Sequence, residues 1–279
     1  MPGLGFSIAG LLVGTAVGAT GVGGGSLMTP ILILFYGVSP ALAVGTDLLY
    51  ASLSKSFGVL LYRRKGSVDW AIVGWQALGS VPASLLTLLF LRRLGVSHEL
   101  DHLIKLTLAI AVVVTATFTL FQDAITGLLI PRTRRESRDK PRMQRTLTVA
   151  AGALIGTVVT ISSVGAGVIG MMLLLLLYPK HPTAKLVGSD LAHAVIITAI
   201  AGLGHARLGT VDYSMLAWLL LGALPGIWLG SRIGFRLDGR SLKRAVAVLL
   251  LVVGTTTLAK AAVLPHAAAP AAAPTAVAR

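Results

Sequence analysis

The sequence contains no cysteine, which excludes disulfides, thiolate metal ligands and cysteine nucleophiles. Acidic residues are also scarce, with ten Asp and Glu against 24 Lys and Arg, and only 12% of the 279 residues are charged. This charge content is far below that of a water-soluble domain, while 55% of the residues are hydrophobic and the mean hydropathy is +0.85. The chain is therefore expected to be an integral membrane protein.

Apolar stretches long enough to cross a hydrocarbon core of about 30 Å, which takes roughly 20 helical residues, recur along the chain. Six of them are continuous and predict transmembrane helices, at 41–62, 68–91, 103–121, 183–203, 211–235 and 244–264. Two longer runs, 6–36 and 147–178, each contain a glycine-rich break. The pattern predicts an all-α integral membrane fold.

The second half of the chain repeats the first. An offset of 142 residues aligns the two broken runs, for example Gly10 with Gly152 and Gly23 with Gly165, and an offset of 143 aligns Asp47 with Asp190. We therefore expect two repeats, at 1–122 and 147–264, each a glycine-broken hairpin followed by three transmembrane helices. A basic cytoplasmic linker at 123–146 separates them, and an Ala/Pro tail at 265–279 has too few large apolar side chains to pack and is expected to be disordered.

The basic residues favour one membrane topology. The net charge of +14 is spread over short loops between apolar segments, which is typical of cytoplasmic retention of Lys and Arg rather than of nucleic-acid binding. If each broken run dips into the membrane and returns, more of these residues share the side of the linker than if each run crosses once. The re-entrant topology therefore obeys the positive-inside bias better, and it makes the two repeats inverted relative to each other.

The two breaks predict an anion-binding site. Irregular backbone at membrane depth is tolerated only where protein or a water-filled cavity surrounds it, and a helix that starts there directs its N–H groups toward an anion. Close helix packing through small residues is the alternative interpretation. The expected substrate-binding residues are Gly21, Gly23, Gly24, Gly25 and Ser26 in the first half, and Ser162, Ser163, Gly165 and Gly167 in the second.

Asp47 and Asp190 are the equivalent acids of the two repeats. Each lies about one or two turns inside a helix that we expect to start near Pro40 or Pro182. A charge inside a bilayer costs about 2.5–3.5 kcal/mol on insertion scales, so a buried acid requires a reason. We expect both to take part in transport, as proton carriers or as cation ligands, with a capping role at a helix start as the alternative.

Residues close to Asp47 and Asp190 in the sequence are further candidates for the site. Tyr50 and His193 lie three residues further along, on the same helical face, and are expected to assist proton coupling, although a hydrogen-bonded packing histidine is equally consistent with the pattern. Thr46, Ser189 and Lys55 are expected to bind the anion, and Lys55 has the alternative of neutralising the nearby acid.

A second pair of equivalent acids, Asp69 and Asp212, has a structural explanation. Each follows a hydroxyl residue at an expected helix start beside a basic loop. We therefore predict both to be N-terminal caps rather than transport residues.

Several motifs together resemble those of the sulfite exporter TauE/SafE family of membrane transporters. They are Gly-Val-Gly-Gly-Gly at 21–25, Val-Gly-Thr at 44–46, Gly-x-Val-Asp at 66–69 and 209–212, and Gly-Ala-Leu-Pro-Gly-Ile-Trp-Leu-Gly at 222–230. The resemblance extends over about 10–237 and implies a multi-pass protein of the bacterial inner membrane that exports small sulfur-containing or carboxylate anions, such as sulfite, sulfonates or sulfoacetate. The chain departs from the common pattern at Asp47, Asp190 and Ala166, which leaves the particular anion open.

We therefore expect a secondary transporter and not an enzyme. Its partners would be a small anion and the lipid bilayer, with no cofactor, metal or nucleic acid; a coupling proton and a homodimer are left open. A passive anion channel is one alternative. Another is an intramembrane enzyme with Ser162 or Ser163 as nucleophile and His193 as base, although no Gly-x-Ser-x-Gly turn accompanies them.

Overall fold

The computed structural model describes residues 2–20, 25–64, 68–95, 97–136, 141–233, 247–248, 250–252 and 254–256. Within these ranges every regular element is an α-helix, as the long apolar runs predict. The helices whose two ends both lie within these ranges are α1 (Pro2–Thr20), α2 (Gly25–Phe35), α3 (Pro40–Arg64), α4 (Trp70–Leu94), α5 (His98–Glu136), α6 (Pro141–Ser162), α7 (Val168–Leu177), α8 (Thr183–Arg207) and α9 (Tyr213–Ile233).

Five helices are long and apolar enough to cross a membrane: α4, α8, and the segments Glu99–Gln122 of α5, Arg142–Ser162 of α6 and Tyr213–Arg232 of α9. The protein is thus a multi-pass membrane protein. Helix α3 has the same length as α8, but Asp47 and Lys55 lower its hydropathy, and its first half is buried among other helices. Most of the sixth predicted span, 244–264, lies outside the described residues, as does the tail.

The break in the second half is present. Helix α6 ends at Ser162, α7 begins at Val168, and three residues between them have positive φ: Ser163 (59°), Gly165 (108°) and Gly167 (136°). Glycine tolerates such angles because it has no Cβ. The residues of the predicted first break, 21–24, lie outside the described part of the chain, after the end of α1 and before the start of α2.

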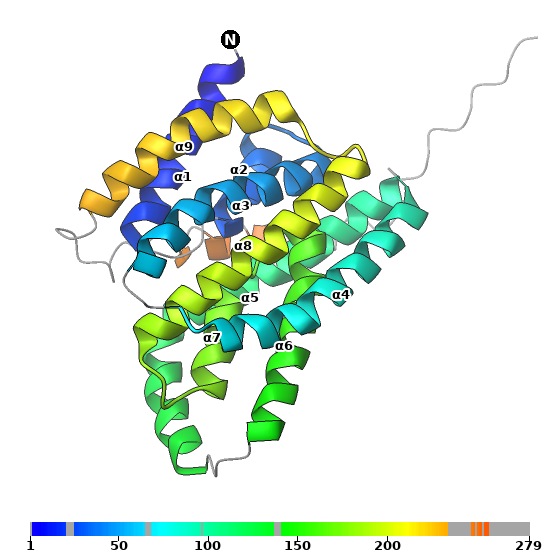
Figure 1. Ribbon diagram of the computed structural model, residues 1–279. Coiled ribbons are helices and arrows are strands. Elements are labelled where there is room, and N and C mark those ends of the chain that lie inside the picture. The colour runs from blue at the N-terminus through cyan, green and yellow to red at the C-terminus, as the bar shows by residue number, and fades with distance from the viewer. Residues whose placement is uncertain are drawn as a thin grey trace, which may run out of the picture.

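Helices of the two halves pack on each other rather than on their own neighbours. Helix α1 runs along α9, α6 runs along α4, and α3 packs against α8 (Figure 1). In Figure 1 the α1–α9 pair lies at the top of the molecule and the α4–α6 pair lies below, with α8 between them. The first helix of each half therefore packs against a helix of the other half.

Glycines allow these helix pairs to approach closely. A Cβ placed on Gly79 of α4 would lie 1.9 Å from the backbone oxygen of Val149 in α6. The residue equivalent to Gly79 in the second half is Gly222 of α9, where a Cβ would lie 1.8 Å from the backbone oxygen of Ser7 in α1. Both interfaces thus bring backbone into contact with backbone, as small residues do in membrane helix pairs.

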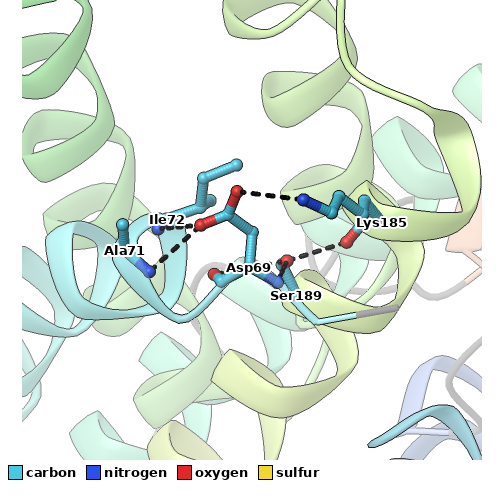
Figure 2. A network of polar contacts seen from close by, with 5 residues as sticks. All are labelled: Asp69, Ala71, Ile72, Lys185 and Ser189. Atoms are coloured by element: carbon cyan, nitrogen blue, oxygen red, sulfur yellow. Dashed lines mark hydrogen bonds and ion pairs between the residues drawn. The ribbon is translucent and has the colours of Figure 1, made fainter. Parts of the chain in front are cut away.

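Each half also caps a helix of the other half. The Ser189 hydroxyl of α8 accepts a hydrogen bond of 2.8 Å from the backbone N–H of Asp69, at the start of α4 (Figure 2). At the equivalent positions, the Thr46 hydroxyl of α3 accepts one of 3.0 Å from the N–H of Asp212, at the start of α9. The two hydroxyls therefore tie α8 to α4 and α3 to α9.

The prediction that Asp69 and Asp212 are caps is confirmed. Asp69 Oδ1 accepts hydrogen bonds from the N–H groups of Ala71 and Ile72 in the first turn of α4, while its other oxygen faces Lys185 at 4.0 Å (Figure 2). Asp212 Oδ1 accepts a hydrogen bond of 2.9 Å from the N–H of Met215. Both carboxylates therefore accept hydrogen bonds from N–H groups in the first turn of a helix.

Candidate functional site

Three charged side chains are buried where α3 and α8 meet. Asp47 is fully buried, Lys55 is 4% exposed and Asp190 is 5% exposed. The Lys55 ammonium interacts electrostatically with Asp190 and also with Asp47. Because isolated charges are costly in a low-dielectric interior, such a group is stable only with partners of opposite sign.

The second glycine break runs beside these three side chains. The Ser163 hydroxyl donates a 3.0 Å hydrogen bond to Asp47 Oδ2, and Lys55 Nζ donates one of 2.8 Å to the backbone oxygen of Ala166. Further along, Gly170 in the first turn of α7 lies against Asp190, whose Oδ1 would be 2.0 Å from a Cβ at that glycine. Ser163 and Ala166 of the break therefore contact Asp47 and Lys55, and Gly170, just after the break, contacts Asp190.

Asp47 contacts both predicted hairpins, α1–α2 and α6–α7. Besides Ser163, its Oδ2 accepts a hydrogen bond of 2.5 Å from the hydroxyl of Thr29 in α2, and its Oδ1 is buried with no hydrogen-bond partner of good geometry among the described residues. Sequence reasoning missed Thr29, since a threonine within an apolar run resembles ordinary packing. Its place in α2, shortly after the first break, was the available indication.

Lys55 lies in a different environment from the one that the sequence predicts. Neutralisation of Asp47 alone was the expected alternative to anion binding, and in the structure Lys55 is within electrostatic range of both acids, while its described hydrogen bond goes to the backbone oxygen of Ala166. The hydrogen bond to Ala166 also joins residues 111 positions apart in the chain. Lys55 thus ties α3 to the break of the other half.

The predicted neighbours of the acids have other partners. His193 Nε2 is 2.8 Å from the Ser80 hydroxyl of α4, and within the described ranges no hydrogen bond joins His193 to Asp190. The buried Tyr50 hydroxyl lies near Ser54, one turn further along α3, without reaching hydrogen-bond geometry. Ser80 was not singled out from the sequence, and only its contact with the histidine marks it.

The geometry does not assemble the nucleophile and base of an intramembrane serine enzyme. The Ser162 hydroxyl donates to the backbone oxygen of Val158 at 2.7 Å, and Ser163 bonds to Asp47. His193 is instead paired with Ser80.

The remaining predicted ligands fall into three groups. Thr46 and Ser189 lie at the capping contacts, where their hydroxyls are engaged. Gly165 and Gly167 lie in the second break, and Gly167 is the N-cap of α7 without a side-chain hydrogen bond. Gly21, Gly23 and Gly24 lie outside the described residues, Gly25 begins α2, and the Ser26 side chain is not described.

Among the side chains that the structure describes, no group of three or more His, Cys, Asp or Glu residues could hold a metal ion.

Comparisons with known proteins agree with this membrane architecture. A family model described as "Sulfite exporter TauE/SafE" matches residues 6–257. The "Probable membrane transporter protein YjnA" of Bacillus subtilis (strain 168) is 35% identical over 249 residues, covering 88% of this chain and 95% of that protein. A "Probable membrane transporter protein" of Xylella fastidiosa (strain 9a5c) is 26% identical, covering 87% of this chain and 89% of its own length. No solved structure matches the chain.

Proposed function

The chain belongs to the sulfite exporter TauE/SafE family of membrane transporters, and from that premise we propose that it is a secondary transporter that exports a small sulfur-containing oxyanion, of the sulfite, sulfonate or sulfoacetate type, together with protons. The observation that carries this proposal is that the second glycine break contacts Asp47 and Lys55, while the first turn of α7 that follows it contacts Asp190. In the substrate-bound state, the anion would lie between the two hairpin breaks, close to the Lys55 ammonium.

The balance of charges supports proton coupling. Two carboxylates and one ammonium are buried together, so the group carries one net negative charge when both acids are ionised. An anion entering such a site is repelled until an acid takes up a proton. Anion binding and protonation therefore favour each other, and the anion and the proton travel in the same direction.

The hydrogen-bonding pattern also suits a proton carrier. The unpartnered Asp47 Oδ1 is buried, and a protonated oxygen at this position would be a donor that faces the bound anion. The carboxylate of Asp190, in α8, lies against Gly170 in the first turn of α7, where the amide N–H groups stabilise negative charge. The two equivalent acids thus differ in the surroundings that stabilise their charge.

We further propose that the repeats are inverted and that the broken runs are re-entrant. The start of α8 contacts the start of α4 through Ser189 and Asp69, while Gly204 near the end of α8 contacts Leu88 near the end of α4. The two helices therefore run in the same direction. If α5 crosses back toward the basic linker, the hairpin α6–α7 begins and ends on one side, which supports a dip rather than a crossing.

The experiment is transport of sulfite and sulfoacetate in proteoliposomes under an imposed pH gradient. We expect the wild type to accumulate anion against its gradient on the alkaline side of the membrane, where protons move with it. Asp47→Asn and Asp190→Asn should keep anion exchange but reduce pH-driven accumulation at least about 10-fold. Glu99→Gln, at an exposed acid in the first turn of α5, is the control.

Different outcomes separate the alternatives. Accumulation that is unchanged in both asparagine variants would remove the protons from the mechanism. A wild type that conducts anion only downhill, whatever the pH gradient, would indicate a passive channel. No flux or binding of any tested anion would overturn the proposed substrate class.

A further inference from the structure

Polar side chains line the buried face of α4. Gln76, Ser80, Ser84 and Thr87 follow one another at spacings of three or four, which places them on one side of the helix. The first three are fully buried. This face packs against α6 and α8, so the polar side chains lie between three helices.

Three members of this row have hydrogen-bond partners among the described residues, and one does not; the Thr87 hydroxyl donates to the backbone oxygen of Ala83 at 2.8 Å. The Ser80 hydroxyl is 2.8 Å from His193 Nε2, and the Ser84 hydroxyl is 2.7 Å from that of Thr160 in α6. By contrast, both Nε2 and Oε1 of Gln76 are buried, and neither has a hydrogen-bond partner among the residues that the structure describes. An amide that loses water and gains no partner is destabilising, so its presence requires a compensating role.

The other half shows that packing does not require this glutamine. The residue equivalent to Gln76 is Leu219 of α9, and the equivalent of Ser80 is Ala223. The backbone contacts at the two sites are alike. A Cβ on Gly152 would lie 2.2 Å from the backbone oxygen of Gln76. A Cβ on Gly10 would also lie 2.2 Å from the backbone oxygen of Leu219. An apolar side chain therefore fits the same helix contact.

Gln76 lies at about the level of Asp190. Helices α4 and α8 run in the same direction, and Ser80 contacts His193. Gln76 precedes Ser80 by one turn, as Asp190 precedes His193 by nearly one turn, and each residue rises about 1.5 Å along a helix. Gln76 is thus at the same height along the helices as the point where Asp190 meets the start of α7.

We propose that Gln76 is a direct ligand of the transported anion. Its NH₂ group donates a hydrogen bond to one oxygen of the anion, and its carbonyl oxygen accepts one from a protonated oxygen of the same ion. The ligand is therefore a small oxyanion that still carries a proton. Gln76 of α4 supplies this contact, and the equivalent residue of α9, Leu219, has no polar group that could supply a second one. This assignment rests on the proposed function and adds a specificity residue that has no counterpart in the first helix pair, α1–α9.

The test is Gln76→Leu, which introduces the residue that the equivalent site already has. We expect the purified variant to unfold at the same temperature as the wild type or higher, because a buried unpaired amide is removed. Its affinity for sulfite, measured by calorimetry or by ligand-induced thermal shift, should fall about 10-fold or more, with a matching loss of sulfite flux. Gln76→Glu, which keeps the length but adds negative charge, should also lose affinity.

The matched control is Gln144→Leu. Gln144 of α6 donates a hydrogen bond of 2.5 Å to the backbone oxygen of Leu177, so its amide already has a structural partner. That variant should lose thermal stability and keep wild-type sulfite affinity. The two variants are therefore expected to differ in opposite ways: Gln76→Leu loses sulfite affinity and keeps its unfolding temperature, while Gln144→Leu keeps sulfite affinity and has a lower unfolding temperature.

The assignment of Gln76 is overturned if Gln76→Leu binds sulfite and sulfoacetate as the wild type does, or if it lowers the unfolding temperature while leaving affinity intact. Either result leaves the proposed transport of anions standing. If the wild type itself neither binds nor moves these anions, the proposed function and the assignment of Gln76 are both overturned.

Discussion

At the scale of single residues, Lys55 has the greatest structural consequence. It is a buried cation beside two acids, and it also holds the backbone of the second break through Ala166. Removing one member of a buried ionic group leaves the remaining charges uncompensated, which is more costly than never having buried them. Lys55 therefore stabilises the break as well as the acids.

We predict that Lys55→Met lowers the free energy of unfolding by about 3–5 kcal/mol. Denaturant or thermal unfolding in detergent measures the loss. Adding Asp190→Asn to this variant should recover part of the stability, because the repulsion of two carboxylates is then relieved. Lys105→Met, at an exposed lysine of α5, should change little; an equal loss in both lysine variants would contradict the prediction.

Sequence reasoning identified the three charged residues but not how they are arranged. Their rarity in apolar runs was sufficient to mark Asp47, Lys55 and Asp190. Their common contact with the second break depends on how two halves pack, and no local spacing encodes it. Thr29 and Gln76 were missed because an uncharged polar residue in an apolar run has no distinctive pattern.

At the scale of the helices, glycine position decides how closely the pairs pack. Helix α4 contains two glycines in different settings. Gly79 packs so closely against the backbone of α6 that a Cβ would not fit there. A Cβ built on Gly74 would have no described atom within 4 Å. The same substitution therefore has opposite effects within one helix.

We predict that Gly79→Ala destabilises the protein by at least about 1–3 kcal/mol, because α4 and α6 must separate. Gly74→Ala should leave stability unchanged or raise it by up to about 1 kcal/mol, since alanine is the better helix former. Unfolding temperatures of the two variants in the same detergent provide the comparison. Equal destabilisation would show that the α4–α6 contact is not as close as described.

The positions of most helices followed from the sequence, because runs of about 20 apolar residues and their glycine interruptions are direct requirements of the bilayer. The starts of α3 and α8 at Pro40 and directly after Pro182 agree with the prediction. Pairing was not predictable in the same way, since the stripe of Gly10, Gly14 and Gly18 marks a contact surface without indicating which helix covers it.

At the scale of the whole molecule, the two halves are interlaced. Each sequence repeat gives its first helix to a partner in the other repeat, and the reciprocal caps by Thr46 and Ser189 reinforce this exchange. We therefore expect that, if groups of helices move as rigid bodies during transport, each group is drawn from both halves and α1 moves together with α9.

This arrangement is testable by cross-linking, since the chain has no cysteine of its own. The Ser7 hydroxyl of α1 donates a hydrogen bond of 2.9 Å to the backbone oxygen of Trp218 in α9. We predict that Ser7→Cys with Trp218→Cys is joined by a short bifunctional thiol reagent, and that the joined protein still transports anion.

The informative control is Ser7→Cys with Trp75→Cys, because Trp75 is the residue of the first half that is equivalent to Trp218. If each repeat folded on itself, this second pair would react instead. Reaction of the control pair alone, or transport blocked by the α1–α9 link, would count against the interlaced arrangement.

The pairing of α1 with α9 also constrains how the protein is made. About 190 residues separate the two helices, and at a synthesis rate of 5–20 residues per second the ribosome needs about 10–40 s to cover that distance. During this interval the glycine face of α1 has no permanent neighbour. The nascent chain must therefore keep its first helix in lipid, or beside the insertion machinery, until the last part of the chain emerges.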